Sequence, residues 1–316
     1  MNKKVSILIP VYNRKKYISE CVQSALNQTH KDIEIIIVDN CSSDGTWDIC
    51  KKLKSSDCRI KIYQNSGNIG PVRNWMRCAD LASGEFSKIL FSDDKLHPEC
   101  IDLMLKELCS DHIGFVYSTA RIGRTEEESL VAYTNDTNPL IESLDYLELL
   151  TRGRAPYSPG AILLRTKDLR QYLTLEIDSK CRHLYSQHGA GPDLMISLQA
   201  LNDYQYIRYI DRALVFFRSH EESFSVQNKD NEIQNSYWST LSLYLKNNNN
   251  RKTWIKYLAY TWLLESRRLK KIIAPSKHIR NYEGDGAIDE ILWLIYFSCR
   301  IATRHFGRKF GYESKN

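Results

Sequence analysis

Hydrophobic and polar positions alternate in blocks along the first 120 residues. Short runs rich in β-branched residues are separated by longer segments in which apolar residues recur at helical spacing. The short runs predict strands over Val5–Val11, Ile33–Val38, Ile60–Tyr63, Phe86–Phe91 and Gly114–Tyr117. The segments between them predict helices around residues 15–28, 46–55, 71–82 and 98–109. Strands that alternate with helices in this way predict an α/β fold with a mostly parallel sheet covered on both faces.

The pattern becomes less regular after residue 120. Between 121 and 230 we expect a strand over Ala161–Leu164, a helix that begins at Gly191-Pro192-Asp193, and a strand over Ala213–Phe217. From about residue 231 onward the pattern is helical and rich in aromatic residues. We therefore expect an α/β domain over 1–230, with halves 1–120 and 121–230, followed by a helical C-terminal region over 231–316.

Composition places the chain among globular proteins, since 42% of its residues are hydrophobic and 26% are charged. The nine cysteines are scattered and include no C-x-x-C pair, which predicts reduced core thiols in a cytosolic protein rather than zinc ligands. Polar residues from Tyr12 onward interrupt the first apolar run, so we expect no signal peptide. The longest apolar run, Ile291–Phe297, has seven residues, whereas a membrane-spanning helix needs roughly 20.

The net charge of +6 is concentrated at the C-terminal end. Residues 251–316 contain 14 Lys and Arg against 6 Asp and Glu, a net charge of +8. An apolar helix predicted there is followed by basic residues; the residues concerned are Ile288, Ile291, Leu292, Trp293, Ile295, Tyr296 and Phe297, then Arg300, Arg304, Arg308 and Lys309. Such a helix can lie in a membrane interface or pack on the α/β domain with its arginines in solvent. Nucleic-acid binding does not fit, because the basic residues follow an apolar helix rather than forming a stripe with exposed aromatics.

Polar residues follow the predicted strands at the points where each strand ends, which is where ligands bind in open α/β sheets. Asp93 and Asp94 follow the fourth strand, and adjacent carboxylates repel each other unless a cation or hydrogen-bond donors compensate. Their oxygens suit Mg²⁺ or Mn²⁺. The alternative is a capped loop before the helix near Pro98. Asp39, after the second strand, can accept a hydrogen bond from a nucleobase N–H.

Two loops between these elements carry further polar residues. The loop Gly67–Pro71 allows a close approach of backbone to a ligand, and Arg73 one turn later can meet phosphate or hold carboxylates. Asp44, followed by glycine and threonine, predicts a turn and a helix cap instead of a site.

The less regular segment contributes three candidates. Asp193 begins a helix and can be either an N-terminal cap or a general base that deprotonates a hydroxyl; the spacing leaves both open. His220 follows a strand and can bind a metal through its neutral imidazole. Arg218 beside it can face the charge of a diphosphate.

Taken in order over residues 3 to 225, these segments resemble the family 2 glycosyltransferases of the GT-A fold. Val5–Asn13 (VSILIPVYN) resembles the opening strand of that family, and Ile35–Thr46 (IIIVDNCSSDGT) resembles its second strand, with the base-recognising aspartate at Asp39. Asn68-Ile69-Gly70 through Arg73-Asn74 resembles the N-x-G…R-N segment. By this resemblance the residues expected to bind the donor are Pro10, Tyr12, Asn13, Asp39, Asn68, Arg73, Asp93 and Arg218.

The later motifs match with two departures. Phe91-Ser92-Asp93-Asp94 resembles the end of a D-x-D-D stretch, which implies that Asp93 and Asp94 contact ribose and metal, but Phe91 replaces the first aspartate. Gly191-Pro192-Asp193 resembles an E-D-x-x-L-x-L helix with Asp193 as the catalytic base, and Pro192 replaces the glutamate. Arg218-Ser219-His220 with Ser223 and Ser225 resembles an R-x-H-x-x-S-x-S segment, which implies that His220 lies near the metal.

The resemblance implies an inverting transfer of a sugar from a nucleotide-sugar, expected to be a UDP-sugar, to a hydroxyl of a saccharide. It implies Mn²⁺ or Mg²⁺ held by Asp93, Asp94 and His220, a polyprenyl-diphosphate-linked acceptor, and work at the cytoplasmic face of the membrane in surface-polysaccharide assembly. A nucleotidyltransferase is an alternative, but the stretch after the first strand, Tyr12–Lys16, lacks the glycines expected of one. A binding module without turnover is another alternative, which the carboxylate missing at Phe91 favours.

Overall fold

The computed structural model describes residues 3–108, 110–135, 138–223, 232–248, 251–268 and 272–282, together with residues 290, 291, 294, 295, 297 and 298. It divides into two compact units. The first, the α/β unit, comprises Met1–Glu176 and Leu184–Ile233, and the second, the helical unit, comprises Ile177–His183 and Gln234–Asn316.

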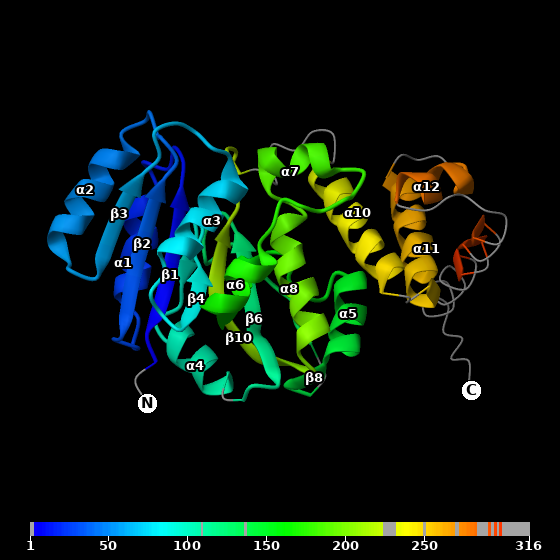
Figure 1. The fold of residues 1–316 in the computed structure, drawn as a ribbon, viewed down its shortest axis with the longest axis horizontal. Helices are drawn as coiled ribbons and strands as arrows, with labels where there is room; N and C mark the ends of the chain where they lie inside the picture. Colours follow the sequence, from blue (N-terminus) through cyan, green and yellow to red (C-terminus); the bar gives the residue numbers. More distant parts are fainter. Residues whose placement is uncertain are drawn as a thin grey trace. The chain divides into compact units, whose positions relative to one another are not determined.

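The described part of the α/β unit contains a ten-stranded sheet of order β3-β2-β1-β4-β9-β6-β10-β5, with β7 paired to β6 and β8 to β10 (Figure 1). The four predicted N-terminal strands are present and parallel; they are β1 (Val5–Val11), β2 (Ile33–Asp39), β3 (Ile60–Gln64) and β4 (Phe86–Ile89). Strand β4 ends two residues earlier than predicted. After the amide of Leu90 bonds to the carbonyl of Leu8 at 2.9 Å, the chain turns into the loop that carries Asp93 and Asp94.

The second half of the sheet is mixed. Strand β9 (Ile162–Arg165) is antiparallel to both β4 and β6 (Ile113–Gly123), and β6 runs parallel to β10 (Tyr206–Arg218). The remaining strands are antiparallel to their partners; they are β5 (Lys95–Leu96), β7 (Ser129–Ala132) and β8 (Leu140–Glu142). Strand β6 continues six residues beyond its predicted end at Tyr117. The apolar pattern stops there in the sequence, but Ala120–Gly123 pair with β7 and so extend the strand.

Helices cover both faces of the sheet. On one face α1 (Ile18–Leu26), α2 (Thr46–Ser56) and α4 (Cys100–Glu107) bury their apolar residues in one cluster with alternate residues of the strands, such as Ile7 and Ile35. The helices α3 (Pro71–Leu81), α5 (Ser143–Thr151), α6 (Thr166–Tyr172) and α8 (Pro192–Asp203) pack on one another and on strands of the sheet. This arrangement confirms the predicted α/β fold and leaves the carboxyl ends of β1, β2 and β4 beside one another.

The helical unit contains α10 (Glu232–Asn247), α11 (Arg251–Arg268) and α12 (Pro275–Asn281), of which α10 begins two residues before the unit boundary. Its interior contains polar groups, among them buried His278, which places Nδ1 2.7 Å from Glu265 Oε2 and Nε2 3.0 Å from Thr261 Oγ1. None of the described helices has the length and hydropathy needed to cross a membrane. Of the predicted apolar helix, Ile288, Leu292, Trp293, Tyr296, Arg300, Arg304, Arg308 and Lys309 lie outside the described residues.

The seven described cysteines are free thiols. Cys21, Cys50, Cys78 and Cys100 are buried, as predicted for core thiols. The prediction is wrong for Cys41 and Cys58, which are exposed because they lie in the loops after β2 and after α2. Cys109 and Cys299 lie outside the described residues.

Candidate active site

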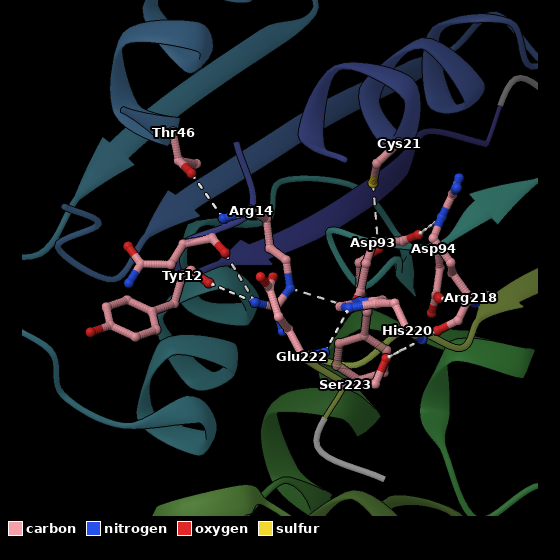
Figure 2. Close-up of polar contacts among 12 residues, drawn as sticks. Tyr12, Arg14, Cys21, Thr46, Asp93, Asp94, Arg218, His220, Glu222 and Ser223 are labelled. Carbon is pink, nitrogen blue, oxygen red and sulfur yellow. Dashed lines mark hydrogen bonds and ion pairs between the residues drawn. The ribbon is translucent and has the colours of Figure 1, made fainter. Parts of the chain in front are cut away.

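The loop between β4 and β5 meets the end of β10, and this brings together residues that the sequence predicted separately (Figure 2). The backbone amide of Arg218 donates to Asp94 Oδ1 at 2.9 Å, and Arg218 Nε donates to the carbonyl oxygen of Asp93 at 3.0 Å. Asp93 Oδ2 lies 2.9 Å from His220 Nε2. Four candidate residues therefore form one cluster at the carboxyl edge of the sheet.

His220 acts as a hydrogen-bond donor in this cluster. Its Nδ1 lies 3.2 Å from the backbone amide of Glu222, which can only donate, so Nδ1 accepts and the proton of a neutral ring is on Nε2. That Nε2–H then donates to Asp93, while the ring packs against Tyr17 with centroids 4.6 Å apart. Both ring nitrogens are engaged in contacts with the protein, and the role of His220 as a direct metal ligand stays a prediction.

Arg218 is held on several sides. Its guanidinium donates to Glu20 Oε2 at 2.5 Å and lies over the rings of Tyr17 and Phe216, at 5.2 and 5.6 Å from their centroids. Burial alone would raise the pKa of Glu20, but Lys95 and Arg218 outweigh it and lower the pKa. Arg218 thus joins α1, β10 and the Asp93–Asp94 loop, and its predicted contact with a donor diphosphate remains a prediction.

Arg14 belongs to the same cluster, although no sequence pattern distinguishes it from its polar neighbours. Its Nε lies 3.3 Å from Asp93 Oδ2, and its backbone amide donates to Thr46 Oγ1 at 2.9 Å. The sequence signal that could have indicated Arg14 was its position in the polar stretch after β1, three residues beyond Val11. Asp93 Oδ2 is therefore shared between Arg14 and His220.

The carboxylates of Asp93 and Asp94 can serve a divalent cation. Asp94 is 6% exposed, and burial followed by the charge of Asp93 raises its pKa. Within the described residues no hydrogen bond engages Asp93 Oδ1 or Asp94 Oδ2, so each carboxylate keeps an oxygen for a ligand. Mg²⁺ and Mn²⁺ take one or two protein carboxylates and complete their shell with phosphate and water, so the donor set fits. No group of three or more His, Cys, Asp or Glu residues suited to a metal occurs in the described part.

Phe91 occupies the position of the missing aspartate, and its side chain packs against an aromatic neighbour. Its ring meets the ring of Trp75 edge-on, with centroids 5.5 Å apart. Its carbonyl oxygen accepts hydrogen bonds from the amide of Asp94 at 2.9 Å and from Cys21 Sγ at 3.4 Å. The side chain thus stabilises the loop without offering a metal ligand.

Asp39 lies at the end of β2, and hydrogen bonds from neighbouring residues fix its carboxylate. It is fully buried, and its Oδ2 accepts from the amide of Ser42 at 3.1 Å and from Gln64 Nε2 at 2.9 Å. Asn13, at φ +51°, accepts from the amide of Ser43 at 2.9 Å and so holds the same loop. Tyr12 is 42% exposed beside it.

Pro10 is buried in β1, in register with Val38 of β2. Asn68 lies in the loop before α3, where its Oδ1 accepts from Asn40 Nδ2 at 2.8 Å and from the amide of Gly70 at 2.9 Å. The first contact ties the loop to the residue that follows Asp39, and the second closes the loop on itself. Arg73 is exposed on α3 and makes no hydrogen bond or ion pair within the described part of the chain.

Asp193 lies in the first turn of α8. It is 5% exposed, and its Oδ1 accepts from the amides of Gly191 at 2.9 Å and Leu194 at 2.7 Å. Gly191 is the N-cap residue of α8, and the Asp193 carboxylate instead accepts from amides at the start of the helix. This anchoring is the part of the capping interpretation that the structure shows. It does not conflict with a role as base, because that role needs a carboxylate whose orientation is fixed.

Tyr133 is a candidate that no sequence pattern indicated. It follows β7 at φ +64°, a conformation that non-glycine residues seldom adopt and that often marks a functional position. Burial raises its pKa to about 12, and Asp94 and Asp193 add to the effect, so its hydroxyl lies in the field of both carboxylates. That hydroxyl makes no hydrogen bond within the described residues.

Residues 6–173, more than half of the 316 residues, match the domain described as glycosyl transferase family 2. The chain belongs to this family. A chondroitin synthase of Pasteurella multocida is 40% identical over 119 residues, which are 37% of this chain and 12% of that protein. This family 2 chain therefore spans only a small part of that relative.

Two solved structures share the fold. A fragment of TarS from S. aureus in complex with UDP-GlcNAc aligns with a TM-score of 0.59 at 17% identity, over 95% of this chain and 92% of that one. A mannosyltransferase from Pyrobaculum calidifontis in complex with GDP-Man and Mn²⁺ aligns with a TM-score of 0.51 at 13% identity, over 95% and 74%. At these identities the likeness shows the fold, and it confirms the predicted GT-A architecture.

Proposed function

We propose that this family 2 chain is a glycosyltransferase that moves a sugar from a nucleoside-diphosphate-sugar to a hydroxyl of a saccharide. The cluster of Asp93, Asp94, Arg218 and His220 carries the proposal, because it gathers two carboxylates and the groups that donate hydrogen bonds to these two residues at the ligand-binding edge of the sheet. A nucleotidyltransferase is less well supported, since residues 12–17 after β1 contain no glycine to wrap phosphates.

The donor is a UDP-sugar in this proposal. The TarS fragment of similar fold binds UDP-GlcNAc, which supports uracil as the base. Asp39 would accept from the base N–H, with exposed Tyr12 beside it, and the Asn68 loop would approach the nucleotide. Because Ser42 and Gln64 already fix the Asp39 carboxylate, little conformational entropy is lost when the base binds.

Asp93 and Asp94 would hold Mn²⁺ or Mg²⁺, in keeping with the Mn²⁺ present in the mannosyltransferase of similar fold. When bound, such an ion supplies Lewis-acid stabilisation of the charge on the leaving diphosphate. Arg14 and His220 hold Asp93 Oδ2 from two sides, and the Arg218 amide holds Asp94 Oδ1. These contacts restrict both carboxylates and leave Asp93 Oδ1 and Asp94 Oδ2 for the ion.

Asp193 would take the proton from the acceptor hydroxyl, which then attacks the anomeric carbon opposite the leaving diphosphate. One base is sufficient for this inverting geometry, and no covalent intermediate forms. Two amide donors fix Asp193 Oδ1, so the carboxylate is oriented before substrate arrives.

The proposed acceptor is a saccharide linked to polyprenyl diphosphate at the cytoplasmic face of the membrane. The relative named chondroitin synthase supports a polysaccharide product, and the +8 charge of residues 251–316 supports attraction to anionic lipid. Co-sedimentation with vesicles that contain anionic lipid tests the second point.

Thermal unfolding with UDP, GDP, CDP or dTDP, each with Mn²⁺ or with a chelator, tests the donor site. A nucleotide at 100 times its Kd stabilises the folded state by about 2.7 kcal/mol. We expect UDP with Mn²⁺ to raise the midpoint and Asp93→Asn to abolish the rise, while Asp48→Asn, an exposed change on α2, leaves it unaltered. Absence of any shift with all four nucleotides would refute the proposal.

A further inference from the structure

A buried three-residue turn, η1 (Pro159–Ala161), lies where several elements of the α/β unit meet. It packs against β4, β6, β10 and α8. Three of these elements lead to the proposed active site. Strand β4 precedes the loop that carries Asp93, β10 ends at Arg218, and the first turn of α8 contains Asp193. A shift of η1 would therefore be transmitted to both sides of the reaction centre.

Lys88 of β4 contacts this turn from within the core. Its side chain is fully buried, and its Nζ donates to the carbonyl oxygen of Gly160. An ammonium has three N–H donors, and within the described residues Gly160 supplies the one hydrogen-bond acceptor. Burial lowers the pKa of Lys88 to about 8. A lysine in such a place is costly for folding, so its contact with Gly160 calls for a function beyond stability.

Gly160 also lies close to Phe217 of β10, with no room for a side chain between them. A Cβ atom at this position would lie 2.8 Å from Cε1 of Phe217, the residue before Arg218, and 3.3 Å from Ser158 Oγ. The first distance is shorter than real Cβ contacts allow. Gly160 thus lets η1 fit between Lys88 of β4 and Phe217 of β10.

We propose that Lys88 and Gly160 are a positioning pair for sugar transfer: through η1 they fix the end of β4, with Asp93 and Asp94, relative to the start of α8, with Asp193. The inference rests on the proposed function of those three aspartates. Neither Lys88 nor Gly160 touches substrate in this account. In-line attack requires base and leaving group on opposite sides of one carbon, and a displacement of 1 Å costs about 10²-fold in rate.

Two variants disturb the pair, and each has a matched control. The test variant Lys88→Met removes the ammonium and keeps a side chain of similar volume. Its control, Ser87→Ala, removes the neighbouring buried polar group of β4, a hydroxyl that contacts Thr166 Oγ1 at 2.8 Å and not η1. Gly160→Ala introduces the close contact with Phe217. Gly114→Ala introduces a comparable one, 2.9 Å from Tyr204 Cδ2, at the amino end of β6. If Lys88→Met fails to fold, the single methyl of Gly160→Ala still tests the proposal.

The readouts are the Kd for UDP with Mn²⁺, and kcat and KM for hydrolysis of the UDP-sugar that the wild type uses, with water as acceptor. We expect Lys88→Met and Gly160→Ala to keep Kd and KM within about twofold while kcat per folded molecule falls by about ten- to a hundredfold. Ser87→Ala and Gly114→Ala should keep kcat. Phe217→Leu should restore turnover to Gly160→Ala, because it opens space for the added methyl.

A kcat of the two test variants equal to that of their controls would overturn the positioning role. If the wild type neither binds a nucleotide nor hydrolyses a donor, the proposed function fails instead. Hydrogen exchange then tests, without any activity, whether Lys88 and Gly160 hold the start of α8 through η1. Amides of residues 194–198 in α8 should lose protection from exchange in Lys88→Met and Gly160→Ala but not in the controls. Unchanged protection would contradict the linkage through η1.

Discussion

Asp93 and His220 are 127 positions apart in the sequence, yet Asp93 Oδ2 and His220 Nε2 lie 2.9 Å apart. The contact forms because β10 leaves the sheet beside the loop that follows β4, and Arg14 approaches the same oxygen to 3.3 Å. Asp93 is therefore oriented by groups from two separate segments, one after β1 and one after β10. Its second oxygen remains for a ligand.

Replacement of His220 should impair this orientation. In His220→Ala the Asp93 carboxylate keeps only Arg14, so we expect weaker Mn²⁺-dependent binding of UDP and a kcat lower by about tenfold, the lower end for loss of a group that orients a metal ligand. His220→Gln retains an N–H donor and should recover part of the loss. Calorimetric titration of UDP with Mn²⁺ measures this. Equal affinity in wild type and His220→Ala would contradict the role assigned to the contact.

Arg14 and Arg73 should differ in how their removal acts. Arg14→Met removes an ion pair with a partly buried carboxylate, so both the unfolding midpoint and UDP affinity should fall. Arg73 is exposed and has no partner within the described residues, so Arg73→Met should leave the midpoint unchanged and weaken UDP binding only. Urea unfolding and UDP titration on both variants separate the two effects. Unaltered UDP affinity in Arg73→Met would remove it from the donor site.

Tyr133 should be needed for turnover and not for folding. Its hydroxyl makes no hydrogen bond within the described part of the chain, so Tyr133→Phe should change the free energy of unfolding by less than about 0.5 kcal/mol. Because the hydroxyl lies in the field of Asp94 and Asp193, we expect kcat to fall several-fold. Steady-state kinetics with the active donor checks this, and an unchanged kcat would assign Tyr133 to packing.

Glu34, at the opposite end of the sheet, should make stability depend on pH. Burial alone would raise its pKa, but hydrogen bonds from Lys61, Ser6 and Ser83 outweigh burial and lower the pKa from 4.5 to about 2. A lowered carboxyl pKa stabilises the fold at pH above 4.5, and this contribution is lost as the pH falls toward 2. The shift corresponds to about 3 kcal/mol.

The measurement is the free energy of unfolding of Glu34→Gln between pH 7 and pH 2. The variant should be less stable than the wild type at pH 7 by about 2 to 3 kcal/mol, with the difference shrinking below pH 4.5. Glu128→Gln, an exposed change, should show no such trend. A difference independent of pH would show that the lost packing, not the charge, matters.

The N-terminal half of the fold could be predicted because its information is local. Runs such as Ile35–Val38 are continuous and apolar, and the strand ends at Asp39 and Asp93 follow directly from them. The antiparallel insertion of β9 between β4 and β6 could not be predicted, since strand order depends on contacts distant in sequence. Short strands such as β5, with two residues, have no periodicity to detect.

The candidate site was predicted in part for the same reason. Asp93, Asp94 and His220 stand in recognisable motifs, whereas Arg14 and Tyr133 depend on which segments meet in space. Lys88 lies in a strand where a charged residue suggests exposure, although its side chain is fully buried. Its partner is a backbone carbonyl, and no residue type marks such a partner in a sequence.

The central claim is that Asp193 is the base of an inverting sugar transfer. Asp193→Asn keeps an oxygen to accept from the amides of Gly191 and Leu194, so the start of α8 should be preserved while the charge is lost. The decisive measurement compares release of UDP from a panel of UDP-sugars by wild type and Asp193→Asn, with the anomer of the first-formed sugar followed by NMR. The account predicts an inverted anomer, unchanged UDP affinity, and a kcat at least about 10²-fold lower in the variant. Equal kcat in the two proteins, or a retained anomer, would contradict it.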